Sequence, residues 1–409
     1  MNFVRHQRII IVAALLMFGA LACSQESQQS EDLSGVSWSE ITDRAEGTDV
    51  TMMMWMGDPF INDYMNQYVK PEVKERFDID LEIVDGQGTQ IVSTLMAELE
   101  SGRRTSQIDM MWINGETFYQ LRQIGALYGP FTENLPNSEY IDFDNPFIGI
   151  DFQQPIDGYE APWGNVQMTL IYNSDYVENP PATREELSKW VRNNPGQFTI
   201  PTEFAGMTFL KSLMIDMAGG EKSLNGDFDE ELYERYSKKL WDFLNDLKPY
   251  FWRNGNTFPN SVAQMHQLFS NGELWFTLSN NDSEVDNKIN QGLFPETARA
   301  YVPEWGSIQN SHFLGISNRS PNIEGAMTVI NFMISPEAQL KKADPTVWGD
   351  GTVLSMEKLP DEWRNEFENI PNRLYAPPRE EIEPYALMEL DPEYMIRMFE
   401  DFRTYVVNR

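Results

Sequence analysis

Apolar residues recur along the chain in short continuous runs that alternate with amphipathic stretches. The run at 50–55 has the length of a buried strand, and the stretch at 89–101 places Ile91, Leu95 and Leu99 on one helical face. Further strands are predicted at 80–84, 108–113, 166–172, 274–278, 300–303 and 313–316, and further helices at 62–77, 209–217, 232–247, 262–269 and 326–333. This alternation predicts an α/β fold in which helices flank mainly parallel sheets.

Two helix starts carry recognisable capping signals. Thr183 is followed three residues later by Glu186, which is the pattern of a capping box. Asp391 precedes Pro392 at the start of a final helix. The methionines at 52–54 are predicted to pack in the core, because adjacent strand residues point to opposite faces and could not converge on one copper ion.

The chain is too long for one hydrophobic core. Its 409 residues predict two lobes. Residues 23–49 are rich in Ser, Gln, Glu and Asp, with only a short apolar pattern at Trp38, Ile41 and Ala45 that hints at a small docking helix. The predicted divisions are a signal peptide at 1–22, a flexible tether at 23–49, a first lobe at 50–164 and 304–350, and a second lobe at 165–303 and 351–409.

The N-terminus resembles a bacterial lipoprotein export signal. A short basic start is followed by an apolar run at 9–22 that is too short to span a bilayer comfortably, and then by Cys23. Lipidation of Cys23 would anchor the protein to a membrane, and an ordinary cleaved signal peptide is the alternative. Both interpretations, a lipoprotein signal and an ordinary signal peptide, predict an exported protein of the periplasm or cell envelope.

Charge and missing motifs exclude several function classes. A formal net charge of −32 excludes nucleic acid as a partner, because a phosphate backbone requires a basic surface. The chain has no nucleophile elbow, zincin motif, P-loop or dinucleotide fingerprint. His266 and His312 have no second ligand type at metal spacing, so neither a metal nor a cofactor is expected. A secreted hydrolase that cleaves glycans with a carboxylate pair stays open.

Four predicted strand ends carry residues suited to a binding site. Glycines, amides or acids directly follow buried strands, and open α/β sheets bind ligands outside the carboxyl ends of their strands. Each loop alone could be an ordinary turn. The four segments are 55–58, 85–88, 112–116 and 280–282.

The order of several motifs resembles a known family. Among them are Trp112-Ile113-Asn114-Gly115-Glu116 and the run from Gly158 to Gln167, which contains Ala161-Pro162-Trp163-Gly164. Further matching segments lie at 129–131, 135–137, 198–201, 209–211, 268–273, 320–322 and 335–339. In this order they resemble the extracellular solute-binding proteins of bacterial ABC importers, above all the YnjB-type branch, over residues 38–370.

The resemblance implies a two-lobe periplasmic binding protein fold of type II, related to the maltose-binding proteins. It places hinge crossings near 159–166, 301–305 and 349–354. It implies a monomer without catalytic activity that captures a small-molecule solute by hinge closure and delivers it to an ABC permease and ATPase complex in the inner membrane. A binding protein that serves a sensor is an alternative. The implied ligand contacts are Trp55, Asp58, Gln87, Asn114, Glu116, Trp163, Thr208, Phe209, Asn280, Asn281, Asp282, Trp305 and Trp348.

These residues have structural alternatives. Trp163, Trp305 and Trp348 could pack the lobe junction or stack on a ligand. Asp58 and Glu116 could cap helices. Phe209 could lie in the core or in the cleft, and Lys211 is expected to point to solvent. The loops suit a sugar or a cationic heterocycle, and the acid excess favours a cationic or neutral solute.

Overall fold

The computed structural model describes residues 33–409. The predicted signal peptide, Cys23 and its lipidation lie outside the described residues. Within 33–409, no helix combines the length and the apolar character that crossing a bilayer requires.

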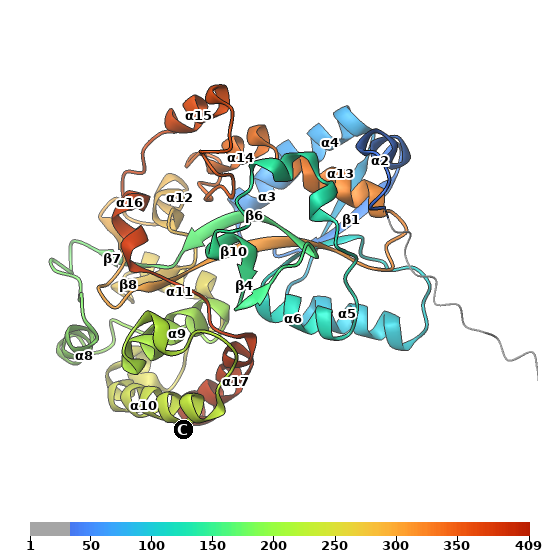
Figure 1. The fold of residues 1–409 in the computed structure, drawn as a ribbon. Coiled ribbons are helices and arrows are strands. Elements are labelled where there is room, and N and C mark those ends of the chain that lie inside the picture. The colour runs from blue at the N-terminus through green and yellow to red at the C-terminus, as the bar shows by residue number, and fades with distance from the viewer. Residues whose placement is uncertain (1–32) are drawn as a thin grey trace, which may run out of the picture. The chain divides into compact units, whose positions relative to one another are not determined.

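The first lobe is built on a six-stranded mixed sheet (Figure 1). The central strand β1 pairs in parallel with β2 and β3, whereas β10 runs antiparallel to β3 and β6 and parallel to β11. The strands are β1 (Asp49–Met54), β2 (Asp80–Asp85), β3 (Met110–Ile113), β6 (Glu160–Gln167), β10 (Ser307–Ile316) and β11 (Ala386–Leu387).

Helices cover both faces of this sheet. Met52 and Met54 are buried on one face and Met53 packs on the other, as predicted for core methionines. One face carries α2 (Trp38–Ala45), the continuous segment α3, η1 and α4 (Pro59–Tyr64, Met65–Val69 and Lys70–Phe77), α13 (Ile323–Met333) and α14 (Pro336–Ala343). The other face carries α5 (Thr89–Glu100) and α6 (Gly115–Gln123), which lie below the sheet in Figure 1.

The expected tether is wrong for its described part. Leu33, Ile41 and Ala45 are buried in the core of the first lobe, and α2 packs against α13. Ser37 caps α2 by accepting a hydrogen bond from the Glu40 amide. The small docking helix suggested by the short apolar pattern is confirmed, and its buried side chains outweigh the polar composition around it.

The second lobe has a three-stranded sheet in the order β8, β7, β9. Both strand pairs are antiparallel, so the expectation of a mainly parallel sheet fails in this lobe, since an apolar run reports burial but not strand direction. Its strands are β7 (Thr169–Asn173), β8 (Phe276–Ser279) and β9 (Ala298–Tyr301), and its helices are α8 (Arg184–Asn193), α9 (Phe204–Ala218), α10 (Glu230–Leu247), α11 (Val262–Ser270), α12 (Glu284–Asn290) and α17 (Pro392–Phe402).

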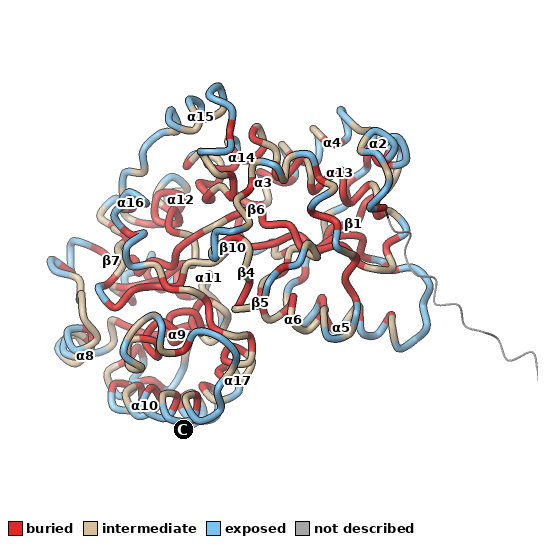
Figure 2. Tube along the Cα trace, in the orientation of Figure 1, coloured by how far each residue is buried: buried red, intermediate tan, exposed pale blue. Residues whose placement is uncertain are grey.

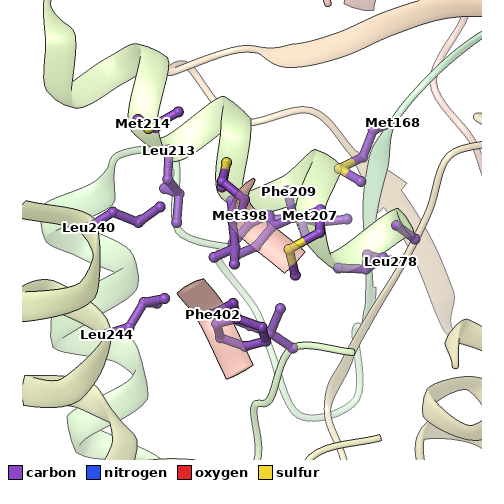
Figure 3. Close-up of a cluster of buried hydrophobic side chains, with 14 of the residues drawn as sticks. Met168, Met207, Phe209, Leu213, Met214, Leu240, Leu244, Leu278, Met398 and Phe402 are labelled. Carbon is purple, nitrogen blue, oxygen red and sulfur yellow. The ribbon is translucent and has the colours of Figure 1, made fainter. Parts of the chain in front are cut away.

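The core of the second lobe lies where α9, α10 and α17 meet. Figure 3 shows Phe209, Leu240 and Phe402 from these helices pointing toward one another. The capping predictions are confirmed: Thr183 accepts a hydrogen bond from the Glu186 amide, and Asp391 accepts one from the Glu393 amide. Short helices and strands complete the fold at α7 (Pro146–Gly149), β4 (Ile150–Asp151), β5 (Gln154–Pro155), α15 (Asp361–Glu368) and α16 (Arg379–Ile382).

The chain passes between the two sheets at short links. Met168 alone separates β6 from β7, and residues 302–306 separate β9 from β10. A third passage was expected at 349–354, but Val353, Leu354 and Leu359 pack in the first lobe, and the largely exposed α15 follows them (Figure 2). The Trp348 carbonyl already accepts a hydrogen bond from Asn287 of α12, and the chain returns to the second lobe near Arg373, which pairs with Asp282. The apolar side chains at 353–359 therefore move this boundary toward the C-terminus.

Candidate solute-binding site

The strand-end loops of the first lobe converge as predicted. The Met56 amide, after β1, donates a hydrogen bond of 3.2 Å to the Asp85 carboxylate at the end of β2. A Cβ on Gly88 would lie 3.8 Å from Glu116 Oε1, so the loop after β2 also meets the start of α6. The indole of Trp55 covers Gly57, where a Cβ would lie 2.4 Å from the ring. Three loops therefore share one edge of the sheet.

Asp58 caps α3 and also binds the second lobe. Its carboxylate accepts a hydrogen bond of 2.8 Å from the Phe60 amide, and it forms an ion pair with Lys288 on α12. Lys288 lies 3.1 Å from Glu284 on its own helix. Burial opposes the charge of Lys288, but Glu284 and Asp58 outweigh it, and the pKa of Lys288 is raised. The capping role and the lobe contact thus belong to one carboxylate.

Lys211 is fully buried, so its expected exposure to solvent is wrong. The residues of α9 from Ala205 to Ile215 are all buried, and a lysine on such a helix faces protein on every side. Its ammonium forms an ion pair with Glu389, between β11 and α17, and lies 4.3 Å from the ring centre of Phe152. A single charge in an apolar helix is thereby held by a carboxylate and an aromatic face.

Lys211 belongs to a buried group of charges that we call the junction cluster. Its members come from both lobes and from the segments that link them: Glu116 on α6, Asp151 on β4, Glu160 on β6, Lys211 on α9 and Glu389. Burial raises the pKa of Glu116 to about 7, while the charge of Lys211 acts against this rise. Glu116 keeps partial exposure, but its Oε2 is buried and finds no hydrogen-bond partner within residues 33–409.

Burial also raises the pKa of the remaining acids of the junction cluster. Burial raises the pKa of Glu389, against the charge of Lys211. Burial raises the pKa of Asp151, and the charges of Glu116 and Glu389 add to this rise. Burial and the charge of Asp151 raise the pKa of Glu160. The junction cluster thus holds more carboxylates than its one lysine can neutralise.

Replacing Glu116 by Gln should make stability less dependent on pH. A folded-state pKa of about 7 means that the folded protein binds this proton more tightly than the unfolded chain does. The stability that comes from this proton is present at low pH and is lost as the pH rises through about 7. At pH 8 the Gln variant should therefore be more stable by about 2 to 3 kcal/mol. Below pH 5 this gain should vanish.

Urea denaturation of both proteins between pH 5 and pH 8 measures the difference. The matched control is Glu82→Gln, at an exposed position of β2, which should follow the wild type at each pH. If Glu116→Gln also followed the wild type at each pH, the buried state of Glu116 would be contradicted.

An aromatic cluster lies beside the strand ends, on the face of the sheet that carries α14. Trp163 and Trp348 are predicted site residues, and their ring centres are 5.2 Å apart. Trp112 lies 5.2 Å from Trp163 and 5.0 Å from His312, which stacks on Trp348. Trp163 has no exposed surface, whereas Trp112 is half-buried. Of the four rings, Trp112 is the one with enough surface to meet a solute.

A buried ion pair supports this aromatic cluster. Lys342 pairs with Asp350, and His312 Nε2 lies 2.9 Å from the same Asp350 oxygen. Burial works against ionised Asp350, but His312 and Lys342 outweigh it and lower its pKa. Trp305, which was grouped with Trp163 and Trp348, packs instead in the core of the second lobe.

Most of the ligand-binding residues predicted in the second lobe instead make contacts within the protein that hold its structure together. Phe209 packs against Phe198 in the core, with ring centres 6.2 Å apart. Thr208 is buried and donates to the Phe204 carbonyl within α9. Asp282 is buried and pairs with Arg373 and Arg379, which fasten the returning C-terminal segment to this lobe.

The remaining predicted ligand-binding residues differ in their burial and in their hydrogen bonds. Asn281 accepts a hydrogen bond from the Ser283 amide, and Asn280 Oδ1 is buried and finds no partner in the described part of the chain. Asn114 precedes α6 and is half-buried, and Gln87 is exposed beside Gly88. The structure thus brings Trp55, Asp58, Gln87, Asn114 and Glu116 to one edge. Across the lobes, Asp58 pairs with Lys288, and the charge of Lys211 acts on Glu116.

Sequence reasoning missed those two lysines, Asp151 and Glu389. The signal for Lys211 was present, since it is a lone charge in a long apolar helix. Lys288 gave no such signal, because its partner Asp58 is 230 positions away. Across residues 33–409, no three His, Cys, Asp or Glu side chains converge as metal ligands.

Comparisons with known proteins agree with this architecture. Residues 67–369 match a family model described as bacterial extracellular solute-binding protein. Protein YnjB of Escherichia coli (strain K12) is 36% identical over 336 residues, which cover 81% of this chain and 86% of that protein.

Solved structures share the fold at low sequence identity. The TpPotD lipoprotein of Treponema pallidum is 12% identical with a TM-score of 0.65, and the comparison covers 88% of this chain and 100% of that chain. A putative spermidine/putrescine ABC transporter from Listeria monocytogenes is 17% identical with a TM-score of 0.62, covering 88% and 99%. These likenesses confirm the two-lobe α/β fold of the periplasmic binding proteins. By its family match and its likeness to YnjB, the chain belongs to the bacterial extracellular solute-binding proteins.

Proposed function

We propose that this protein is the solute-binding component of an ABC importer. It captures a small molecule between its two lobes, closes around it, and delivers it to a permease and ATPase complex. The observation that carries the proposal is the pairing of strand-end acids of the first lobe with lysines of the second lobe, above all Asp58 with Lys288. Contacts of this kind form when the lobes approach and are lost when they separate.

The short links between the sheets support motion of one lobe against the other. Met168 and residues 302–306 are the places where a change in backbone angles would rotate the lobes. A solute drives closure only if it binds the closed form better than the open form. Residues at the strand ends can make that difference, because they contact the second lobe only when the lobes are together.

The cellular location of the protein follows from the same proposal. Export by the predicted signal and lipidation at Cys23 would keep a monomeric binding protein beside its membrane partners. Binding of the captured solute is expected to involve no chemical turnover, as in other solute-binding proteins of this family.

Reconstitution with the transporter tests the importer role. A candidate ABC permease and ATPase pair should be placed in liposomes, and ATP hydrolysis should be measured with and without the protein and a solute that stabilises it. We expect hydrolysis to rise only when protein and solute are both present. A rate of ATP hydrolysis that does not change when the protein and solute are added would contradict the importer role and favour a binding protein that serves a sensor.

A further inference from the structure

The two contacts between strand-end acids and lysines share one arrangement. Lys288 pairs with Asp58 of the first lobe and with Glu284 of its own helix. Lys211 pairs with Glu389 and is within electrostatic reach of Glu116 of the first lobe. Each lysine therefore pairs with a glutamate in addition to its interaction with an acid of the first lobe. The acid of the first lobe is the charge left without a partner when the lobes separate.

The acid excess is largest in the junction cluster. Glu116, Asp151 and Glu389 surround one ammonium group, that of Lys211. Asp151 and Glu389 are 2% and 4% exposed, and each has a carboxylate oxygen without a hydrogen-bond partner within the described chain. Buried carboxylates without partners are costly, and a bound cation would remove that cost.

The lining of the junction cluster is already suited to an ammonium group. The Lys211 ammonium lies 4.3 Å from the ring centre of Phe152 and 5.9 Å from that of Phe204. Aromatic faces combined with carboxylates are the usual surroundings of a bound organic cation. Glu116 keeps partial exposure beside the exposed Gln87, so the cluster can be reached from the strand-end edge. Since no metal-ligand group converges within residues 33–409, the arrangement favours an organic cation over a metal ion.

We propose that the captured solute is an organic cation whose ammonium or similar group binds Glu116 and the neighbouring unpaired carboxylates of the junction cluster. This inference rests on the proposed function and specifies the charge of its solute. A neutral sugar can donate hydrogen bonds to the unpaired carboxylates but leaves their mutual repulsion in place, and an anion would add to that repulsion.

A binding panel on the full mature protein tests the charge of the solute. Spermidine and thiamine serve as organic cations, maltose as a neutral probe and citrate as an anion, with thermal shift and isothermal titration calorimetry as readouts. We expect stabilisation by a cation and none by maltose or citrate. In Glu116→Gln the dissociation constant for that cation should rise roughly 10- to 100-fold, as for the loss of a charge-assisted contact.

The control Glu82→Gln changes an exposed acid of the same lobe and should bind the cation as the wild type does. Circular dichroism confirms that each variant is folded. Stabilisation by maltose or citrate without any by the cations would overturn the inference, and so would cation binding that is equal in Glu116→Gln and wild type.

Scattering separates this inference from the proposed function. If maltose or citrate bound and compacted the protein in small-angle scattering, the cation assignment would fall and the two-lobe trap would stand. If a cation bound through Glu116 without compaction, the charge assignment would be supported and lobe closure would be contradicted.

Discussion

Replacing Lys211 by Met should lower the free energy of unfolding by about 3 to 5 kcal/mol at pH 7.5, because a buried ion pair loses one partner. Lys211 is fully buried and paired with Glu389. Its removal leaves the largely buried carboxylates of the junction cluster without that ammonium. Urea denaturation followed by tryptophan fluorescence measures the loss.

The loss should shrink at low pH. Burial raises the pKa of Glu116, Asp151 and Glu389, so these groups take up protons more readily than ordinary carboxyls and their repulsion falls as the pH drops. Lys189→Met, at an exposed position of α8, is the matched control and should change stability by less than about 0.5 kcal/mol. Equal stability of the two variants would mean that Lys211 is not in a buried charge cluster.

Replacing Trp163 by Ala should cost about 3 to 5 kcal/mol of stability, as for other large buried side chains. Trp163 has no exposed surface and packs among Trp112, Trp348 and His312. The sequence left open whether this tryptophan packs the lobe junction or stacks on a solute. Its burial favours packing, and thermal and urea denaturation measure the cost.

Trp112→Ala provides the comparison within the same aromatic cluster. Because Trp112 is half-buried, its loss should cost less stability and should weaken solute binding more than the loss of Trp163 does. A Trp163→Ala protein as stable as the wild type, but unable to bind solute, would reverse this assignment of roles.

Local patterns in the sequence were sufficient for most elements of the fold. The capping signals at Thr183 and Asp391 mark real helix starts, and the apolar run at 50–55 corresponds to β1. Such patterns depend on burial and on backbone hydrogen bonds between near neighbours. Strand direction depends on distant connections, and this is why the antiparallel second sheet was not predicted.

Composition was a poor guide to order near the N-terminus. Polar residues around Trp38, Ile41 and Ala45 suggested a flexible tether, yet Ile41 and Ala45 are fully buried in the first lobe. These apolar side chains order the segment because the surface of α13 lies beside them, and the sequence does not reveal that surface.

Only the side of the candidate site that the first lobe provides was predictable from the sequence. Strand-end residues such as Asp58 and Glu116 follow from the position of loops after strands, and the structure brings these loops together. Of their counterparts on helices of the other lobe, Lys211 stands out in the sequence as a lone charge in an apolar helix, but its partner Glu389 and the whole contact of Lys288 become visible only when the chain is folded. The ligand contacts remain a prediction, and the residues of the junction cluster are the first positions at which to test it.

Small-angle scattering of the mature protein, with and without a solute that raises its melting temperature, tests the central claim most directly. Closure of the two lobes predicts a smaller radius of gyration with solute and a return to the larger value after dialysis. An unchanged radius of gyration with a solute that stabilises the protein would contradict capture by lobe closure.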